Sequence, residues 1–239
     1  MGRYFCHEHP EVLSLETRVI DARPGAVVLE QTPFYPGGGG QLADRGILRC
    51  KGGEASVTGF EPAADGRFWH LLGAAAEPTG TVQAVVDAEF RTTMTELHTG
   101  THILNALVFQ QFDRALVTGA QLNDDRTARM DFDLPEADND KLRALEAGLN
   151  DLVRQDLPLR YTYVPLGEAT AQHGLIRSRS VAPPPGDDGL IRIVEIVGLD
   201  RQACGGTHLA STGRSRPLRI LKIDNKGRHN RRIRIGLQG

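Results

Sequence analysis

The chain has 239 residues, of which 40% are hydrophobic and 24% charged, and its formal net charge is −2. These ordinary values exclude a protein that binds polyanions over its whole surface, and no apolar run reaches the ~18 residues of a membrane span. Its three cysteines, Cys6, Cys50 and Cys204, are too few for a disulfide framework. Because the N-terminus also lacks an apolar signal sequence, we expect a cytoplasmic protein with no membrane partner.

Residues 1–88 have the pattern of a small β-rich domain. The stretch "TRVIDARPGAVVLEQTPF" places two apolar runs on either side of Pro24-Gly25, which predicts a hairpin. Further short strands are expected at "ASVTGF", "RFWHLL" and "TVQAVVD". Several short strands separated by turn residues favour a small barrel or sandwich.

Residues 89–239 have a mixed α/β pattern. Helical spacing runs through "FRTTMTELHTGTHILNALVFQQF", and "ALVTGAQL" and "TARMDFDL" are expected to form strands. A second helix is predicted to start at Pro135 and to carry a leucine stripe of Leu142, Leu145, Leu149 and Leu152. Strands are then expected at "LRYTYVPL", "LIRIVEIVGL", "LRILKID" and "RRIRIGL". These patterns predict the α+β class, with a β-rich domain, a barrel or a sandwich, followed by an α/β domain.

Two pairs of candidate metal ligands stand far apart in the chain. His98 and His102 are four residues apart, about one helical turn, so their rings would leave the same helix face. The stretch "CGGTH" repeats the four-residue spacing with Cys204 and His208. One thiolate and three imidazoles suit tetrahedral Zn²⁺. The glutamate of the zinc protease motif H-E-x-x-H is replaced by Thr99, which indicates chemistry other than peptide hydrolysis.

Two further stretches suggest contacts with RNA, although each also has a purely structural interpretation. Gly38, Gly39 and Gly40 lead into Gln41 within "PGGGGQ", and Gly39-Gly40-Gln41 is the tripeptide that peptide release factors use on ester-linked tRNA. The same glycines would also suit a plain turn between strands. Residues 211–239 carry nine Arg or Lys and one acid, and the candidate contacts among them are Lys226, Arg228, Arg231 and Arg232. Such charges would meet a phosphate backbone or protect an edge strand.

In combination and in this order, "FYPGGGGQLADRG", "HTGTHIL", "CGGTH" and "KGRHNRRIRI" resemble the editing module of alanyl-tRNA synthetase and its free-standing relatives, the AlaX proteins. The resemblance covers roughly residues 15–236, and the β-rich N-terminal part is similar to the medium-length AlaX class. The resemblance implies a small β-barrel followed by a zinc-containing α/β editing domain, with His98, His102, Cys204 and His208 as the zinc ligands.

The resemblance also implies a function. The expected reaction is hydrolysis of the ester that joins serine or glycine to alanine tRNA, with tRNA rather than DNA as the partner. His98 or His102 would serve as a catalytic base if it is not a ligand. Thr118, Gln121 and Gly100 are the expected substrate-pocket residues.

Three alternatives stay open at this point. Gly100 stands where the family usually has alanine, and a roomier pocket would favour threonine or an analogue on threonine tRNA. A non-catalytic tRNA-binding module with structural zinc is compatible with a closed four-ligand set. A zinc hydrolase of small esters or amides is the third. The oligomeric state and the roles of Cys6 and Cys50 are not indicated.

Overall fold

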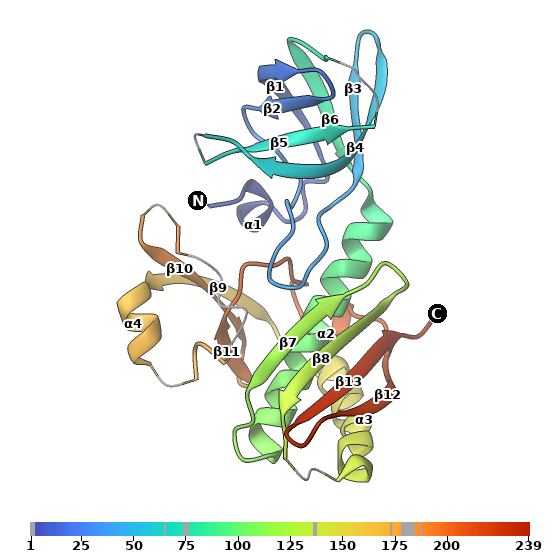
Figure 1. Cartoon of the computed structure of the whole chain (residues 1–239), viewed down its shortest axis with the longest axis vertical. Coiled ribbons are helices and arrows are strands. Elements are labelled where there is room, and N and C mark those ends of the chain that lie inside the picture. Colours follow the sequence, from blue (N-terminus) through green and yellow to red (C-terminus); the bar gives the residue numbers. More distant parts are fainter. Residues whose placement is uncertain are drawn as a thin grey trace. The chain divides into compact units, whose positions relative to one another are not determined.

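The computed structural model describes residues 3–64, 66–73, 77–135, 138–172, 174–177, 185–186 and 188–239 (Figure 1). The chain divides into two compact units. The first is Met1–Gly38, Leu42–Thr92 and Gly186–Asp188, and the second is Gly39–Gln41, Thr93–Pro185 and Gly189–Gly239. The division falls inside a long helix, shortly after the boundary at residue 88 that the sequence indicates. The described residues contain no helix long and apolar enough to cross a membrane.

The first unit contains a closed six-stranded barrel, which confirms the predicted β-barrel. Its strand order is β1-β2-β5-β4-β3-β6. The elements are α1 (Phe5–Glu8), β1 (Ser14–Arg23), β2 (Ala26–Leu29), β3 (Gly46–Cys50), β4 (Gly53–Pro62), β5 (Phe68–Leu72) and β6 (Thr81–Val86). The predicted hairpin forms, with Arg23 opposite Ala26 across Pro24-Gly25. Closure leaves the barrel without an exposed strand edge.

The two ends of the glycine-rich segment are fastened by a buried ion pair in the first unit. The Arg91 guanidinium donates to both carboxylate oxygens of Asp44 and to the carbonyl of Pro33. Asp44 in turn accepts from the amide of Tyr35, and its own amide donates to the Tyr35 carbonyl. Both side chains of the pair are almost fully buried. The segment between Tyr35 and Asp44 is therefore held at both of its ends.

Helix α2 (Ala88–Gln111) begins in the first unit and supplies the central helix of the second. The Asp87 carboxylate accepts from the amide of Phe90, an N-cap contact that fixes where the helix starts. From Thr93 to Val108 every residue of α2 is buried. One side of this stretch is polar, with Thr95, His98, His102 and Asn105 among its residues. Buried polar groups need partners, so this side is where a functional site is expected.

The second unit combines two antiparallel sheets with three helices. The four-stranded sheet has the order β12-β13-β8-β7 and the three-stranded sheet the order β11-β10-β9. Its further elements are β7 (Val117–Leu122), β8 (Thr127–Asp133), α3 (Asn139–Arg154), β9 (Leu159–Pro165), α4 (Leu166–Ala171), β10 (Leu190–Ile196), β11 (Asp200–Ala203), the 3₁₀ turn η1 (Thr212–Arg214), β12 (Leu218–Lys226) and β13 (Asn230–Leu237). Helices α2 and α3 lie against one face of the four-stranded sheet (Figure 1). The mixed composition confirms the predicted α+β class.

Two details of the predicted second helix are wrong. The helix starts at Asn139 rather than at Pro135, because the Asp138 side chain caps it by accepting from the Asp140 amide. Its buried stripe continues from Leu149 to Val153, and the predicted Leu152 is only partly buried. The capping carboxylate of Asp138, and not Pro135, therefore marks the start of this helix.

Candidate metal centre

The structure brings the four candidate ligands together in the second unit. His98 and His102 project from the polar side of α2, and Cys204 and His208 come from the loop that follows β11. One ligand atom from each of the four lies within 4.8 Å of the others, and all four residues are buried. The Cys204 Sγ lies 3.3 Å from the Nε2 of His98 and 3.3 Å from the Nε2 of His208. The ring centroid of His208 is 4.4 Å from those of His98 and His102.

This donor set fits zinc. With Zn–S of about 2.3 Å and Zn–N of about 2.0 Å, a sulfur and a nitrogen ligand of a tetrahedral ion lie ~3.5 Å apart, close to both sulfur–nitrogen separations here. A thiolate with imidazoles is also the ligand combination that zinc prefers over calcium or magnesium. The four residues could therefore hold one zinc ion.

Gln41 fixes which nitrogen of His98 is free to bind a metal. The Gln41 Oε1 accepts from the Thr207 amide at 3.0 Å and lies 2.7 Å from the His98 Nδ1. Its Nε2 donates to the Thr207 hydroxyl at 2.8 Å, so the oxygen must be the atom that faces His98. His98 Nδ1 therefore carries the proton, and the lone pair of Nε2 points toward the cluster. Such an outer hydrogen bond orients a metal-bound histidine and makes it a better ligand.

The glycine at position 206 is required by the His98 ring. A Cβ at this position would lie 2.0 Å from His98 Cε1, 2.2 Å from its Nδ1 and 2.8 Å from Gln41 Oε1. The Gly206 amide also donates to the Cys204 sulfur at 3.4 Å. The second glycine of "CGGTH" thus lets the loop lie flat against the imidazole, and its backbone supports the thiol.

Two threonines of α2 hold the other end of the loop. Thr95 and Thr207 share a hydrogen bond of 2.9 Å between their hydroxyls. The Thr99 hydroxyl accepts from the Leu209 amide at 3.1 Å and lies 3.4 Å from the His208 Nδ1. Thr99 occupies the place of the protease glutamate, and here its side chain positions the loop and His208.

The surroundings of His98 and His102 keep these two imidazoles neutral. Burial lowers the pKa of His98 to about 3, and the positive charge of Arg192 adds to this effect. Burial also lowers the pKa of His102 well below its ordinary value, with further contributions from His98, Arg192 and Arg177. For Cys204, burial raises the pKa of the thiol, while the Gly206 amide and Arg192 act in the opposite direction. Neutral imidazoles present lone pairs at neutral pH, and a bound cation would deprotonate the thiol.

The residues predicted for the substrate pocket have their described contacts elsewhere. The Thr118 hydroxyl donates to Asn230, and the Gln121 side chain accepts from Arg129, both within the four-stranded sheet. Gly100 faces the other side of α2 from the cluster, where a Cβ would lie 2.9 Å from Leu218. Their assignment to an acyl pocket stays a prediction, and the geometry gives Gly100 a packing role.

The predicted tRNA contacts differ in their surroundings. Gly38 belongs to the first unit, where its carbonyl accepts from the Tyr35 hydroxyl, whereas Gly39, Gly40 and Gln41 belong to the second. Gly39 has open space around it. The Gly40 carbonyl accepts from the Leu122 amide, and a Cβ on Gly40 would lie 2.6 Å from the Ala120 carbonyl oxygen. Gln41 is 4% exposed and its side chain contacts His98 and Thr207, while its contact with tRNA stays a prediction.

The basic residues near the C-terminus split into exposed and engaged ones. Lys226 and Arg228 are exposed at the end of β12 and the turn that follows it. Arg231 is largely buried, and Arg232 forms a two-pronged ion pair with Asp131 on β8. Only the first two have charges fully available to a phosphate backbone.

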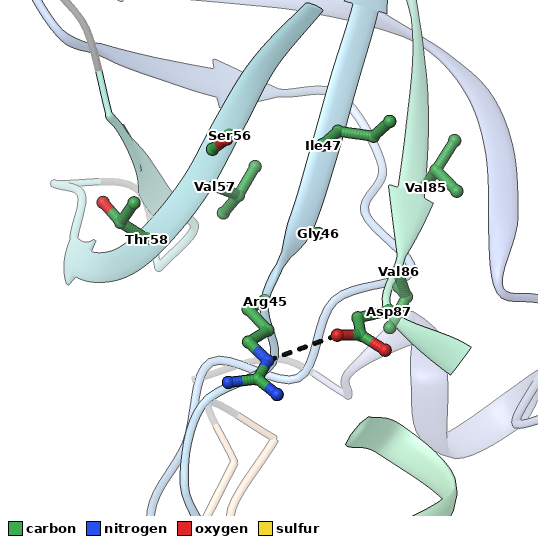
Figure 2. Close-up of a pocket in the computed structure, with 9 residues that line it drawn as sticks. All are labelled: Arg45, Gly46, Ile47, Ser56, Val57, Thr58, Val85, Val86 and Asp87. Carbon is green, nitrogen blue, oxygen red and sulfur yellow. Dashed lines mark hydrogen bonds and ion pairs between the residues drawn. The ribbon is translucent and has the colours of Figure 1, made fainter. Parts of the chain in front are cut away.

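A separate pocket of about 620 Å³ opens on the barrel and lies outside the predicted site (Figure 2). Strands β3, β4 and β6 line it, and its charged residues, Arg45 and Asp87, are paired at 3.2 Å. The Arg45 guanidinium also lies 4.3 Å from the centre of the Phe90 ring. Its lining has no cysteine or histidine, unlike the metal cluster.

Several residues around the cluster were missed in the sequence. Thr95, Thr207 and Arg192 contact or influence the ligands, and of these only Thr207 lies within a quoted motif, "CGGTH". For Arg192 a signal existed, because a charge between Ile191 and Ile193 in an apolar strand is unusual in a buried element.

Comparison with known proteins assigns both units to translation enzymes. Residues 191–234 match the family described as threonyl and alanyl tRNA synthetase second additional domain, and residues 9–90 match the family of class II (A) tRNA synthetases. The alanyl-tRNA editing protein AlaX-M of Saccharolobus solfataricus is 32% identical over 93% of this chain and 93% of its own length. The AlaX-M protein of Methanosarcina barkeri is 35% identical over 87% of this chain and 86% of its own.

A much larger enzyme is also similar. The alanine–tRNA ligase of Methanopyrus kandleri is 38% identical over 82% of this chain, which spans 21% of the ligase. The chain therefore matches a section of the ligase and nearly the whole of the editing proteins. The two AlaX-M proteins, at 32% and 35% identity, match 93% and 87% of this chain and so extend over both units. The chain therefore belongs to the AlaX family of alanyl-tRNA editing proteins.

Proposed function

We propose that this protein is a zinc-dependent hydrolase that cleaves the ester of serine or glycine wrongly attached to alanine tRNA. The observation that carries the proposal is the buried cluster of one thiol and three imidazoles, held by Gln41, in a chain collinear with alanyl-tRNA editing proteins. The residues that would hold the ion are His98, His102, Cys204 and His208. When bound, zinc would supply a Lewis acid for an ester carbonyl or a water, which would have to enter as a fifth ligand or displace one of the four.

The reaction expected of such a site is an ester cleavage. An aminoacyl ester is more reactive than a peptide, so the cluster can act without the carboxylate base of zinc proteases. The structure agrees with this division, because Thr99 replaces that carboxylate and is engaged with the Leu209 amide and His208. Burial of the four ligands keeps bulk water away from them, which strengthens every electrostatic interaction with the substrate.

His102 is the ligand with the greatest freedom to serve as a base. His98 is tied to Gln41, His208 lies against Thr99, and the Cys204 sulfur accepts from the Gly206 amide. Among the described residues the His102 side chain has no hydrogen-bond partner. As a base His102 would not be a ligand, because the single lone pair of a neutral imidazole cannot hold a metal and accept a proton at the same time.

A second candidate is supported by the family match, which includes threonyl-tRNA synthetases. In it the substrate would be threonine or a similar β-hydroxy amino acid on threonine tRNA. A third, of another class, is a tRNA-binding module in which the closed four-ligand set holds structural zinc.

The test is a deacylation panel with Ser, Gly, Ala and Thr, each on alanine and threonine tRNA. We expect release of serine and glycine from alanine tRNA, with alanine retained. Release confined to threonine tRNA would replace the first candidate by the second. Salt-dependent tRNA binding without turnover on any substrate would favour the third.

A further inference from the structure

Arg192 is a buried cation placed behind the metal loop. It lies on β10 and is 6% exposed. The residues on either side of it, Ile191 and Ile193, belong to an apolar cluster with Ala169 and Leu175. Because side chains alternate along a strand, Arg192 projects to the opposite face of the sheet, where Cys204 stands.

Three hydrogen bonds connect Arg192 to the loop. Its Nη1 donates to the carbonyl of Cys204 at 3.1 Å and to the carbonyl of Gly206 at 2.9 Å. Its own carbonyl accepts from the Cys204 amide at 3.1 Å. The residue therefore fixes the backbone on both sides of Gly205, directly next to the thiol ligand.

Tyr161 on β9 completes the support. The Arg192 guanidinium lies 4.2 Å from the centre of the Tyr161 ring, a cation–π contact. The Tyr161 hydroxyl lies 3.4 Å from the carbonyl oxygens of His208 and Leu209, at the long end of hydrogen-bond distances. Together the two side chains contact the carbonyls of both loop ligands, Cys204 and His208.

The charge of Arg192 is itself unusual. Among the described residues it has no carboxylate partner, and its Nε is buried without a hydrogen-bond partner. A buried cation without a paired anion is costly, so the contacts that it makes must offset the loss of its hydration. Its orientation is set by the two carbonyls and the tyrosine ring, which indicates a role in holding the loop.

We propose that Arg192 is the positioning residue of the metal centre, with Tyr161 as its support. It fixes the carbonyls of Cys204 and Gly206 so that the thiol and the His208 ring meet the two histidines of α2 at bonding distance. This proposal rests on the zinc assignment above, but metal binding can be measured without tRNA. Its failure is therefore distinguishable from failure of the proposed deacylation.

The test compares Arg192→Gln and Arg192→Lys with the full chain, using zinc affinity by chelator competition and the absorption spectrum of the cobalt-substituted protein. A glutamine side chain has no charge and cannot donate to both carbonyls, so we expect zinc affinity to fall about 10- to 100-fold. This is the range for residues that orient metal ligands. Lysine keeps the charge and reaches one carbonyl, so affinity should recover to within a few-fold while the cobalt bands shift. Arg160→Gln, on the exposed side of β9, is the matched control and should leave both readouts unchanged.

A folded Arg192→Gln variant with wild-type zinc affinity and an unchanged cobalt spectrum would overturn the proposal. Should that variant fail to fold, Tyr161→Phe offers a second route, since it keeps the ring beneath Arg192 and removes only the hydroxyl. We expect altered cobalt bands in Tyr161→Phe, as in Arg192→Lys. Unchanged bands in both of these would equally contradict the proposal.

Discussion

Substitution of Gly206 by alanine is the most direct perturbation of the metal centre that leaves all four ligands in the sequence. An added Cβ would lie 2.0 Å from His98 Cε1 and 2.8 Å from Gln41 Oε1. Carbon atoms in contact lie about 3.5–4.0 Å apart, so the ring or the loop must move by more than ~1 Å. Metal–ligand distances tolerate only about 0.2 Å, and such a shift removes one ligand from the ion.

The expected loss has two parts. Zinc affinity should fall by at least ~100-fold, since loss of a ligand exceeds the 10- to 100-fold effect of disturbing an outer partner. Stability of the metal-free chain should fall by about 1–3 kcal/mol from overpacking, with a further ~1 kcal/mol from the strained bond between His98 and Gln41.

Chelator competition measures the first loss and urea unfolding the second. The matched control is Gly167→Ala in α4, where an added Cβ meets nothing within 4 Å. That substitution should leave zinc affinity unchanged. Wild-type zinc affinity in Gly206→Ala would refute the placement of His98 against the loop.

Three further outcomes follow from the structure. Gln41→Leu leaves the His98 Nδ1–H and the Thr207 amide without an acceptor, so zinc affinity, measured by chelator competition, should fall about 10- to 100-fold. Folding lowers the pKa of His70 from 6.5 to about 4, so the unfolded chain binds more protons between these values and stability falls as the pH drops through this window. Between pH 7 and 4.5 the free energy of unfolding of the barrel should fall by about 2 kcal/mol more in the wild type than in His70→Asn. The fluorescence of Trp69 during urea unfolding measures this difference. Gly100→Ala adds a Cβ 2.9 Å from Leu218 and should change the free energy of unfolding by no more than ~1 kcal/mol. Zinc affinity and substrate choice should stay as in the wild type. An altered substrate choice would instead support the assignment of Gly100 to the substrate pocket.

Much of the fold could be predicted from local patterns in the sequence. The Pro24-Gly25 turn and the short alternating runs were sufficient for a hairpin and a β-rich domain, because turn chemistry and a period of two act over a few residues. Closure into a barrel depends on pairing between distant strands, which these patterns left open between a barrel and a sandwich. Strand β11, with the sequence "DRQA", was not predicted, since its four residues lack apolar alternation and pair only because β10 lies beside them. Helix α4 was missed because its six residues, "LGEATA", are too few for a helical period.

In the candidate site, too, some residues could be predicted from local patterns and others could not. The four-residue spacings of the two ligand pairs are local and visible in the sequence, and the structure places the four residues together. The contacts of Gln41 with His98 and Thr207 join positions 57 and 166 residues apart, which no window along the chain could show. The sequence suggested a tRNA contact for this glutamine, and its burial beside the cluster indicates a supporting role.

The proposed function assigns hydrolysis of mischarged alanine tRNA to the four-residue cluster. Its most direct test measures serine release from Ser-tRNA(Ala), together with zinc content, for the wild type, Cys204→Ala and Cys50→Ala. Cys50 is a half-buried barrel residue whose loss should change neither quantity. We predict rapid release by the wild type and a loss of roughly 100-fold or more in Cys204→Ala together with its zinc, because Lewis-acid stabilisation is worth several kcal/mol. Undiminished serine release by a zinc-free Cys204→Ala variant would contradict the account.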